Sequence, residues 1–168
     1  MYTKIGPARG TAETGDRFGS AVAFMARPDL DFGDDERLVV GAPGEDVGAL
    51  ADADAGAARV VLLYRYCEFG CGSDVYPDQA VTVIQGKGNT PGVAGSGNQF
   101  GATVSRVPGV DRAILVGSPG QTVAGMSGAG AVTVLDPAPT LSHQLDQSTR
   151  ALPGRPRAGD GFGILPTQ

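Results

Sequence analysis

A short motif containing glycine and phenylalanine recurs three times along the chain. It reads Gly-Asp-Arg-Phe-Gly at 15–19, Gly-Asn-Gln-Phe-Gly at 97–101 and Gly-Asp-Gly-Phe-Gly at 159–163. The phenylalanines Phe18, Phe100 and Phe162 stand 82 and then 62 residues apart. An ordered recurrence of this kind indicates a repeat protein, in which each unit buries its apolar side against a neighbouring unit.

The first two copies of the motif are followed by the same parts in the same order. Leu-Val-Val-Gly-Ala-Pro-Gly at 38–44 matches Ile-Leu-Val-Gly-Ser-Pro-Gly at 114–120, and a small-residue turn with a β-branched run follows each. The sequence therefore predicts one unit over 1–168, with repeat one at about 12–85, repeat two at about 94–145 and the start of repeat three at about 157–168. The longer first repeat indicates an insertion at about 66–79.

Composition favours an all-β fold. The 27 glycines and 12 prolines make up 23% of the residues, where average usage gives roughly 12%, and both residues disfavour helix interiors. Only 140–152 offers spacing for a short helix. Short runs rich in valine and aromatic residues predict two sets of four strands, at 18–24, 38–40, 59–64 and 80–84, and at 100–104, 113–116, 131–135 and 141–145.

Charge and hydropathy exclude several classes of partner. The formal net charge is −5, and Lys and Arg form no cluster, so neither nucleic acid nor an anionic membrane surface is an expected partner. No apolar run reaches the roughly 18 residues of a membrane-spanning helix, and we expect no membrane insertion.

The two cysteines lie four residues apart, at Cys67 and Cys71. In an oxidising compartment they could close a small loop as a disulfide bond, and in a reducing one they would remain free thiols. Two thiols are too few for a structural zinc site, because such a site needs four ligands.

Phe-Gly followed after about twenty residues by Gly-Ala-Pro, here Phe18-Gly19 and Gly41-Ala42-Pro43, resembles the FG-GAP repeat. This repeat is found in the amino-terminal β-propellers of integrin α-chains and in many bacterial secreted proteins. The second copy departs from it at Ser118. The resemblance implies β-propeller blades, about two of them plus the start of a third, as an incomplete propeller whose complete form has about seven blades. It also implies a secreted or cell-surface location.

The same resemblance implies a calcium loop between the two motifs, of the form Asp-x-Asp-x-Asp-Gly-x-x-Asp. Calcium prefers six to eight oxygen ligands. Asp29 and Asp31 match the first and third ligand positions, while Gly33 and Arg37 replace the fifth and ninth; Asp34 or Asp35 could substitute in a rearranged loop. The alternative is an acidic turn exposed to solvent. Repeat two has one carboxylate in this stretch, Asp111, and we expect no metal there.

A second acidic group follows the first Gly-Ala-Pro and consists of Glu45, Asp46, Asp52 and Asp54. Such a loop could hold a cation or a basic partner, or it could simply be a soluble acidic loop.

No catalytic constellation is evident. Ser142, His143 and Asp146 include the residue types of a hydrolase triad, but triad members converge from separate elements and no nucleophile-elbow pattern surrounds a serine. We therefore expect a polar turn or a helix surface at this place, and no catalytic or cofactor-binding residue elsewhere.

The expected function is that of a non-enzymatic extracellular binding or adhesion module of the integrin α-like type, with a protein or glycan ligand held by loops. Two alternatives remain open: an accessory propeller segment of a secreted hydrolase, and a truncated fragment with no independent function. Two blades leave apolar faces and edges uncovered. Closure would therefore need the remaining propeller blades or other copies of the chain.

Overall fold

The computed structural model describes residues 12–25, 36–47, 53–65, 75–110, 113–135 and 142–164. These residues form two four-stranded antiparallel sheets and no helix. The all-β fold class is therefore confirmed. Within the same residues, no helix is long and apolar enough to cross a lipid bilayer.

Each sheet is a meander in which every strand pairs with the next one along the chain. The first sheet contains β1 (Ala21–Met25), β2 (Glu36–Ala42), β3 (Ala57–Arg65) and β4 (Val75–Val83). The second contains β5 (Thr103–Arg106), β6 (Ile114–Ser118), β7 (Ala131–Leu135) and β8 (His143–Leu145). Two sets of four strands were predicted and are found, but β1 and β5 begin three residues later than the predicted starts at Phe18 and Phe100. Both phenylalanines lie in turns, in which Ser20 N donates to the Arg17 carbonyl and Ala102 N to the Gln99 carbonyl, each at 3.0 Å.

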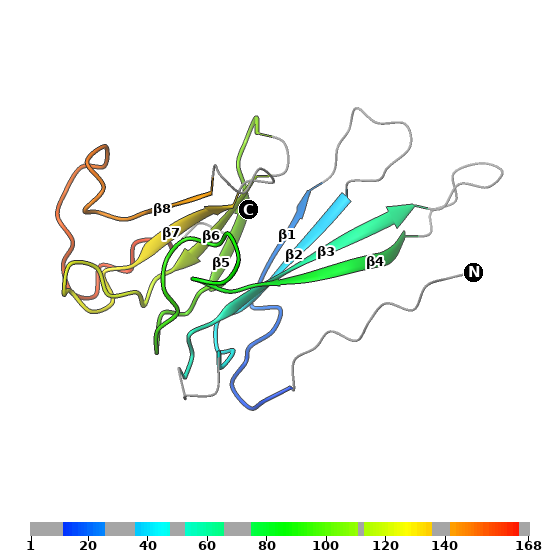
Figure 1. The fold of residues 1–168 in the computed structure, drawn as a ribbon, viewed down its shortest axis with the longest axis horizontal. Helices are drawn as coiled ribbons and strands as arrows, with labels where there is room; N and C mark the ends of the chain where they lie inside the picture. The colour runs from blue at the N-terminus through cyan, green and yellow to red at the C-terminus, as the bar shows by residue number, and fades with distance from the viewer. Residues whose placement is uncertain are drawn as a thin grey trace.

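The two repeats differ most in their last hairpin. β3 and β4 have nine residues each, whereas β7 has five and β8 three. β4 begins at Val75, inside the segment predicted as an insertion and five residues before the predicted strand start at Ala80. Part of the extra sequence in repeat one therefore lengthens a hairpin instead of forming a separate loop, and Figure 1 shows these two strands extending beyond the rest of the sheet.

The window that offered spacing for a short helix contains β8 and a turn. Asp146 accepts hydrogen bonds on Oδ1 from the backbone N of Ser148 at 2.7 Å and from its hydroxyl at 2.5 Å. Thr149 accepts one from the backbone N of Asp146 at 3.1 Å. These local side-chain bonds favour a turn over a helix, and 142–152 contains no helix.

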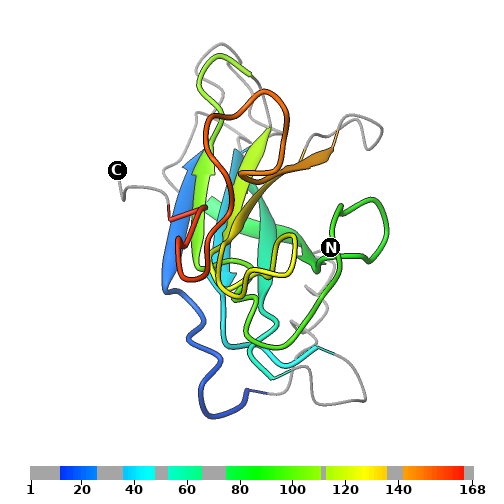
Figure 2. The ribbon, with the colours of Figure 1, turned by 90° about the vertical axis from the view of Figure 1, so that its left-hand side faces the viewer.

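The two sheets pack face to face, with β1 and β2 of the first sheet against β5 of the second (Figures 1 and 2). Apolar side chains from both sheets fill the space between them. The buried members of this core are Met25, Val39, Ala58, Phe100, Ile114 and Val116, with the partly buried Ala23, Val60, Val83, Val104 and Leu135 packed against them.

Side chains alternate between the two faces of a strand, so every second residue of β1, β2 and β3 lies on the face of the first sheet that is opposite the core. Several of these residues are apolar. Cross-strand partners share a face, and Val22 pairs with Val40 while Phe24 pairs with Leu38 and Leu38 with Val61. We call Val22, Phe24, Leu38 and Val61 the outer face. Val22 and Phe24 of β1 are 56% and 50% exposed, so the described residues leave this part of the face open, whereas Val40 and Glu36 on the same face are 6% and 8% exposed.

Candidate functional site

Backbone hydrogen bonds join the two sheets beside the apolar core. Three amide N–H groups of the second Phe-Gly motif donate to successive carbonyls of the loop that precedes β3. The bonds are Gly97 to Ala53 at 2.9 Å, Gln99 to Asp54 at 3.0 Å and Phe100 to Ala55 at 3.0 Å. We call this set the first clasp.

The third motif makes the same joint with the second sheet. Here the N–H groups of Gly159, Gly161 and Phe162 donate to the carbonyls of Ser127, Gly128 and Ala129, at 2.9, 2.9 and 2.8 Å. We call this set the second clasp. Because the two clasps use equivalent positions of the repeat, the segment 159–163 occupies on the second sheet the place that 97–101 occupies on the first.

A glycine is required beside each clasp. Gly56 has φ +85° and Gly130 has φ +84°, conformations that side chains with a Cβ rarely adopt. A Cβ on Gly56 would overlap the backbone of Phe100, and one on Gly130 would overlap the backbone of Phe162. The small-residue turn noted in each repeat therefore exists to let the next motif approach.

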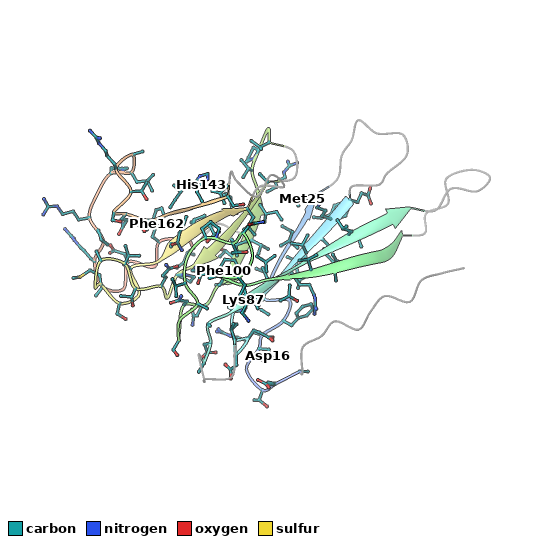
Figure 3. All side chains as sticks on the ribbon, viewed as in Figure 1. Asp16, Met25, Lys87, Phe100, His143 and Phe162 are labelled. Carbon is teal, nitrogen blue, oxygen red and sulfur yellow. The ribbon has the colours of Figure 1, made fainter. Side chains whose placement is uncertain are left out.

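The three motif phenylalanines occupy three different environments. Phe100 is 0% exposed and lies between the sheets, as Figure 3 shows. Phe162 is half-buried against the second sheet. Phe18 precedes the first sheet, where the described residues include no earlier sheet to receive it, and it is 62% exposed.

A cluster of side-chain amides lies beside the first clasp. Asn98 donates from Nδ2 to Gln85 Oε1 at 3.0 Å and to the carbonyl of Val93 at 2.9 Å. Gln121 Oε1 accepts from Gln85 Nε2 at 2.8 Å and from Gln144 Nε2 at 2.7 Å. We call Gln85, Asn98, Gln121 and Gln144 the amide cluster. Gln85 and Asn98 are only 2% and 7% exposed, so this cluster ties the last strand of repeat one to repeat two inside the joint.

Repeat one carries carboxylates where repeat two carries amides. Asp16 stands at the motif position of Asn98, and Glu45 follows Gly44 as Gln121 follows Gly120. The backbone agrees with this match, because Gly44 N donates to the Asp16 carbonyl and Gly120 N to the Asn98 carbonyl, both at 3.1 Å. The end of the first sheet that lacks a described neighbour is therefore acidic at the position of the amide cluster.

The pKa of Glu45 is raised above its ordinary value. Partial burial is the main cause, and the negative charges of Asp16, Glu13 and Asp46 add to it, while Arg59 acts in the opposite direction. Asp46 also orders the loop, since its Oδ1 accepts a 2.9 Å hydrogen bond from the backbone N of Asp54. The crowded carboxylates make this end of the sheet a place that favours hydrogen-bond donors or cations.

Several predicted site residues lie outside the described residues. They are Asp29, Asp31, Asp34 and Asp35 of the degenerate calcium loop, the cysteines Cys67 and Cys71, and Asp52 of the second acidic group. The other members of that group, Glu45, Asp46 and Asp54, are described, and they lie in the loop that forms the first clasp. Among the described residues, no three His, Cys, Asp or Glu side chains are placed to hold a metal ion.

Ser142, His143 and Asp146, which are the residue types of a hydrolase triad, all lie in or directly beside β8. His143 is an exposed residue of β8 and pairs with Val134 of β7, while the Asp146 carboxylate holds the following turn through Ser148. Figure 3 shows His143 on the second sheet, and the next residue, Gln144, belongs to the amide cluster.

Sequence reasoning singled out neither the amide cluster nor the clasps. The bonded members of the amide cluster are separated by 13, 23 and 36 residues along the chain. Glutamine and asparagine are mostly solvent-exposed in proteins, so these residues gave no sign of burial. One signal was available: Asn98 falls inside the recurring motif, and Gln121 directly follows Gly-Ser-Pro-Gly. Comparison of the sequence with protein-family models and with curated proteins finds no match.

Proposed function

We propose that the chain is a non-catalytic binding scaffold built from FG-GAP-type propeller blades, with each four-stranded sheet acting as one blade. The observation that carries the proposal is the recurrence of the clasp. Two sheets in sequence present the same backbone carbonyls to the same motif, which is how a stackable unit behaves. The second and third Phe-Gly motifs lie at these joints, against Gly41 of Gly-Ala-Pro and Gly117 of Gly-Ser-Pro, so the motif order and the packing agree.

The proposed role follows from what the blades leave available. The loop between β2 and β3 at the clasp end carries Glu45, Asp46 and Asp54, and Glu13 and Asp16 lie close enough before β1 to act on Glu45. A rigid pair of sheets holds these segments in place. A protein or glycan ligand with basic or hydrogen-bond-donating groups fits this end of the molecule. On this proposal the protein acts outside the cell, as a secreted or surface-attached adhesion module.

Calcium remains part of the proposal through Asp29, Asp31, Asp34 and Asp35. A bound ion would stabilise the folded state by mass action. The melting temperature should therefore rise when millimolar calcium is added and fall when a chelator removes it. An identical melting temperature under the two conditions would remove the metal from the proposal.

The binding role is tested by presenting the purified chain to arrays of extracellular proteins and glycans. We expect saturable binding that weakens in a variant with Glu45→Gln, Asp46→Asn and Asp54→Asn. A matched control carries Asp146→Asn and Asp160→Asn, on the second sheet and its following segment. Parallel assays with ester, glycoside and phosphodiester substrates should give no turnover; turnover that Ser142→Ala abolishes would replace the scaffold by a hydrolase.

A further inference from the structure

The outer face of the first sheet has an equivalent in the second sheet, and that equivalent is covered. Counting from the motif, Val104, Ile114 and Leu135 correspond to Val22, Leu38 and Val61. Val104, Ile114 and Leu135 all pack into the core between the sheets. What covers them is the opposite side of the preceding sheet. A surface of the same kind is therefore the natural partner of the outer face.

The second sheet offers such a surface on its far side. Leu115 pairs with Val134, and Val132 pairs with Leu145, so these four side chains share the face turned away from the first sheet. We call them the free face. They correspond to positions such as Val39, Ala58 and Val60, which receive the second sheet in the existing joint. Among the described residues, the outer face thus has no sheet against it, whereas the free face has the segment 159–163 beside it, and Val132 is only 7% exposed.

Polar groups at the two ends also match. Gln147 lies twelve residues before Gly159, as Gln85 lies twelve before Gly97. Gln85 donates to Gln121 in the amide cluster, and Glu45 holds the position of Gln121 in repeat one. In a stacked pair, Gln147 Nε2 of one molecule would donate to the Glu45 carboxylate of the next, as Gln85 Nε2 donates to Gln121. The buried Gln147 Oε1 would gain no donor there, because Asp16 stands at the position of Asn98.

One segment of the chain stands in the way of this stacking. In a stacked pair, the motif 15–19 of the incoming molecule would lie on the second sheet of its neighbour. In the single molecule, that place is taken by its own segment 159–163. The second clasp holds this segment, and Thr103 Oγ1 donates to the Gly163 carbonyl at 2.6 Å. The two segments read Gly-Asp-Arg-Phe-Gly and Gly-Asp-Gly-Phe-Gly. Because the clasp uses backbone atoms, either segment can make the same bonds.

We propose that copies of this chain associate head to tail, the outer face of one copy packing on the free face of the next, and that 15–19 of the incoming copy displaces 159–163 from the second clasp. The joint is heterologous, so repetition gives open chains or closed rings. The segment 159–163 acts as an internal competitor that sets the strength of association. The inference rests on the repeated packing geometry and is independent of any ligand.

The experiment measures self-association by sedimentation equilibrium. Phe162→Ala loosens the competitor and should strengthen association at least tenfold, because a half-buried phenyl ring is lost from the intramolecular joint only. Adding Phe18→Ser to that variant should weaken association at least tenfold. Adding Val93→Ser, at a side chain that is 76% exposed and lies outside both faces, should change nothing.

Direction is tested by mixing. The double variant Phe18→Ser, Phe162→Ala lacks a working head but keeps an accessible tail, so it should form mixed complexes with the Phe162→Ala chain and shorten its assemblies. Circular dichroism of each dilute variant confirms that the fold is retained. A Phe162→Ala chain that is folded and monomeric at every concentration would overturn the proposal, and so would association that Phe18→Ser leaves unchanged.

Discussion

The two repeats carry the same Phe-Gly motif, but only the motif of repeat two is preceded by a described sheet. Comparing them separates the role of the motif from the role of the residues around it. Phe100 is fully buried because a sheet precedes it, whereas Phe18 is 62% exposed. The amides of Asn98 and Gln121 are tied into one cluster, whereas in repeat one partial burial and the negative charge of Asp16 raise the pKa of Glu45. The motif therefore provides a standard joint, and the residues beside it adjust that joint to its neighbour.

The largest expected difference in stability between the two repeats comes from removing the phenyl ring of Phe100 or of Phe18. Phe100→Ala should lower the free energy of unfolding by about 3–5 kcal/mol, because a large buried ring leaves a cavity between the sheets. Phe18→Ala should change it by less than about 0.5 kcal/mol at low protein concentration. Denaturant titration followed by circular dichroism measures both values. Equal losses would mean that the two positions are packed alike.

The next effect comes from the glycines. Gly56→Ala should cost about 3 kcal/mol or more, because positive φ strains the new residue and its Cβ overlaps the Phe100 backbone. Gly88→Ala is the matched control: Gly88 has φ +59° with nothing within 4 Å of a Cβ, so only the cost of the left-handed backbone conformation, roughly 1–2 kcal/mol, remains. The difference in unfolding free energy between the two variants isolates the close approach at the first clasp.

The amide cluster should show a smaller effect. Gln121→Ala leaves Gln85 and Gln144 without their shared acceptor and should cost about 1–3 kcal/mol. In a double-mutant cycle with Gln85→Ala the two losses should be coupled by about 0.5 kcal/mol or more. Strictly additive losses would show that the Gln85–Gln121 hydrogen bond contributes nothing to the joint.

The smallest expected effect on stability concerns Glu45, at the acidic end of the first sheet. The pKa of Glu45 is raised from its ordinary 4.5 by burial and by neighbouring carboxylates. A carboxyl with a raised folded-state pKa favours folding when protonated, and this contribution is lost as pH rises above 4.5 through the folded-state value. Glu45→Gln should therefore raise the melting temperature at pH 7 and flatten its dependence on pH just above 4.5. Parallel pH curves for the two proteins would contradict the assignment.

Sequence pattern predicted the fold class well because strand alternation and turn residues are local signals. The runs around Val39 and Val116 are short, apolar and bounded by glycine and proline, and both are central strands of their sheets. The start of β4 was placed too late, since Val75 to Gln79 contains proline and aspartate, which are poor strand formers. Their place in the sheet comes from pairing with β3, which is a longer-range interaction.

The candidate site was much harder to predict, because it depends on which distant residues the stacking brings together. Gln85 and Gln121 come from different sheets, and only the packing of those sheets makes them neighbours. The acidic residues Glu45, Asp46 and Asp54 were noticed from charge alone, but their place in the clasp loop follows from backbone hydrogen bonds that carry no sequence signature. The recurring glycines were evident in the sequence, but the close backbone approach that requires them was not.

The clasp joins one sheet to the next through main-chain amides and carbonyls, and its demand on sequence is confined to glycines such as Gly56 and Gly130. These backbone bonds place no demand on the strand side chains, which are constrained instead by the apolar core between the sheets. An in-frame duplication of one repeat would therefore inherit a working joint at both ends before any further mutation. The architecture can lengthen or shorten by whole units in a single genetic event, while each unit's loops remain free to acquire separate binding properties.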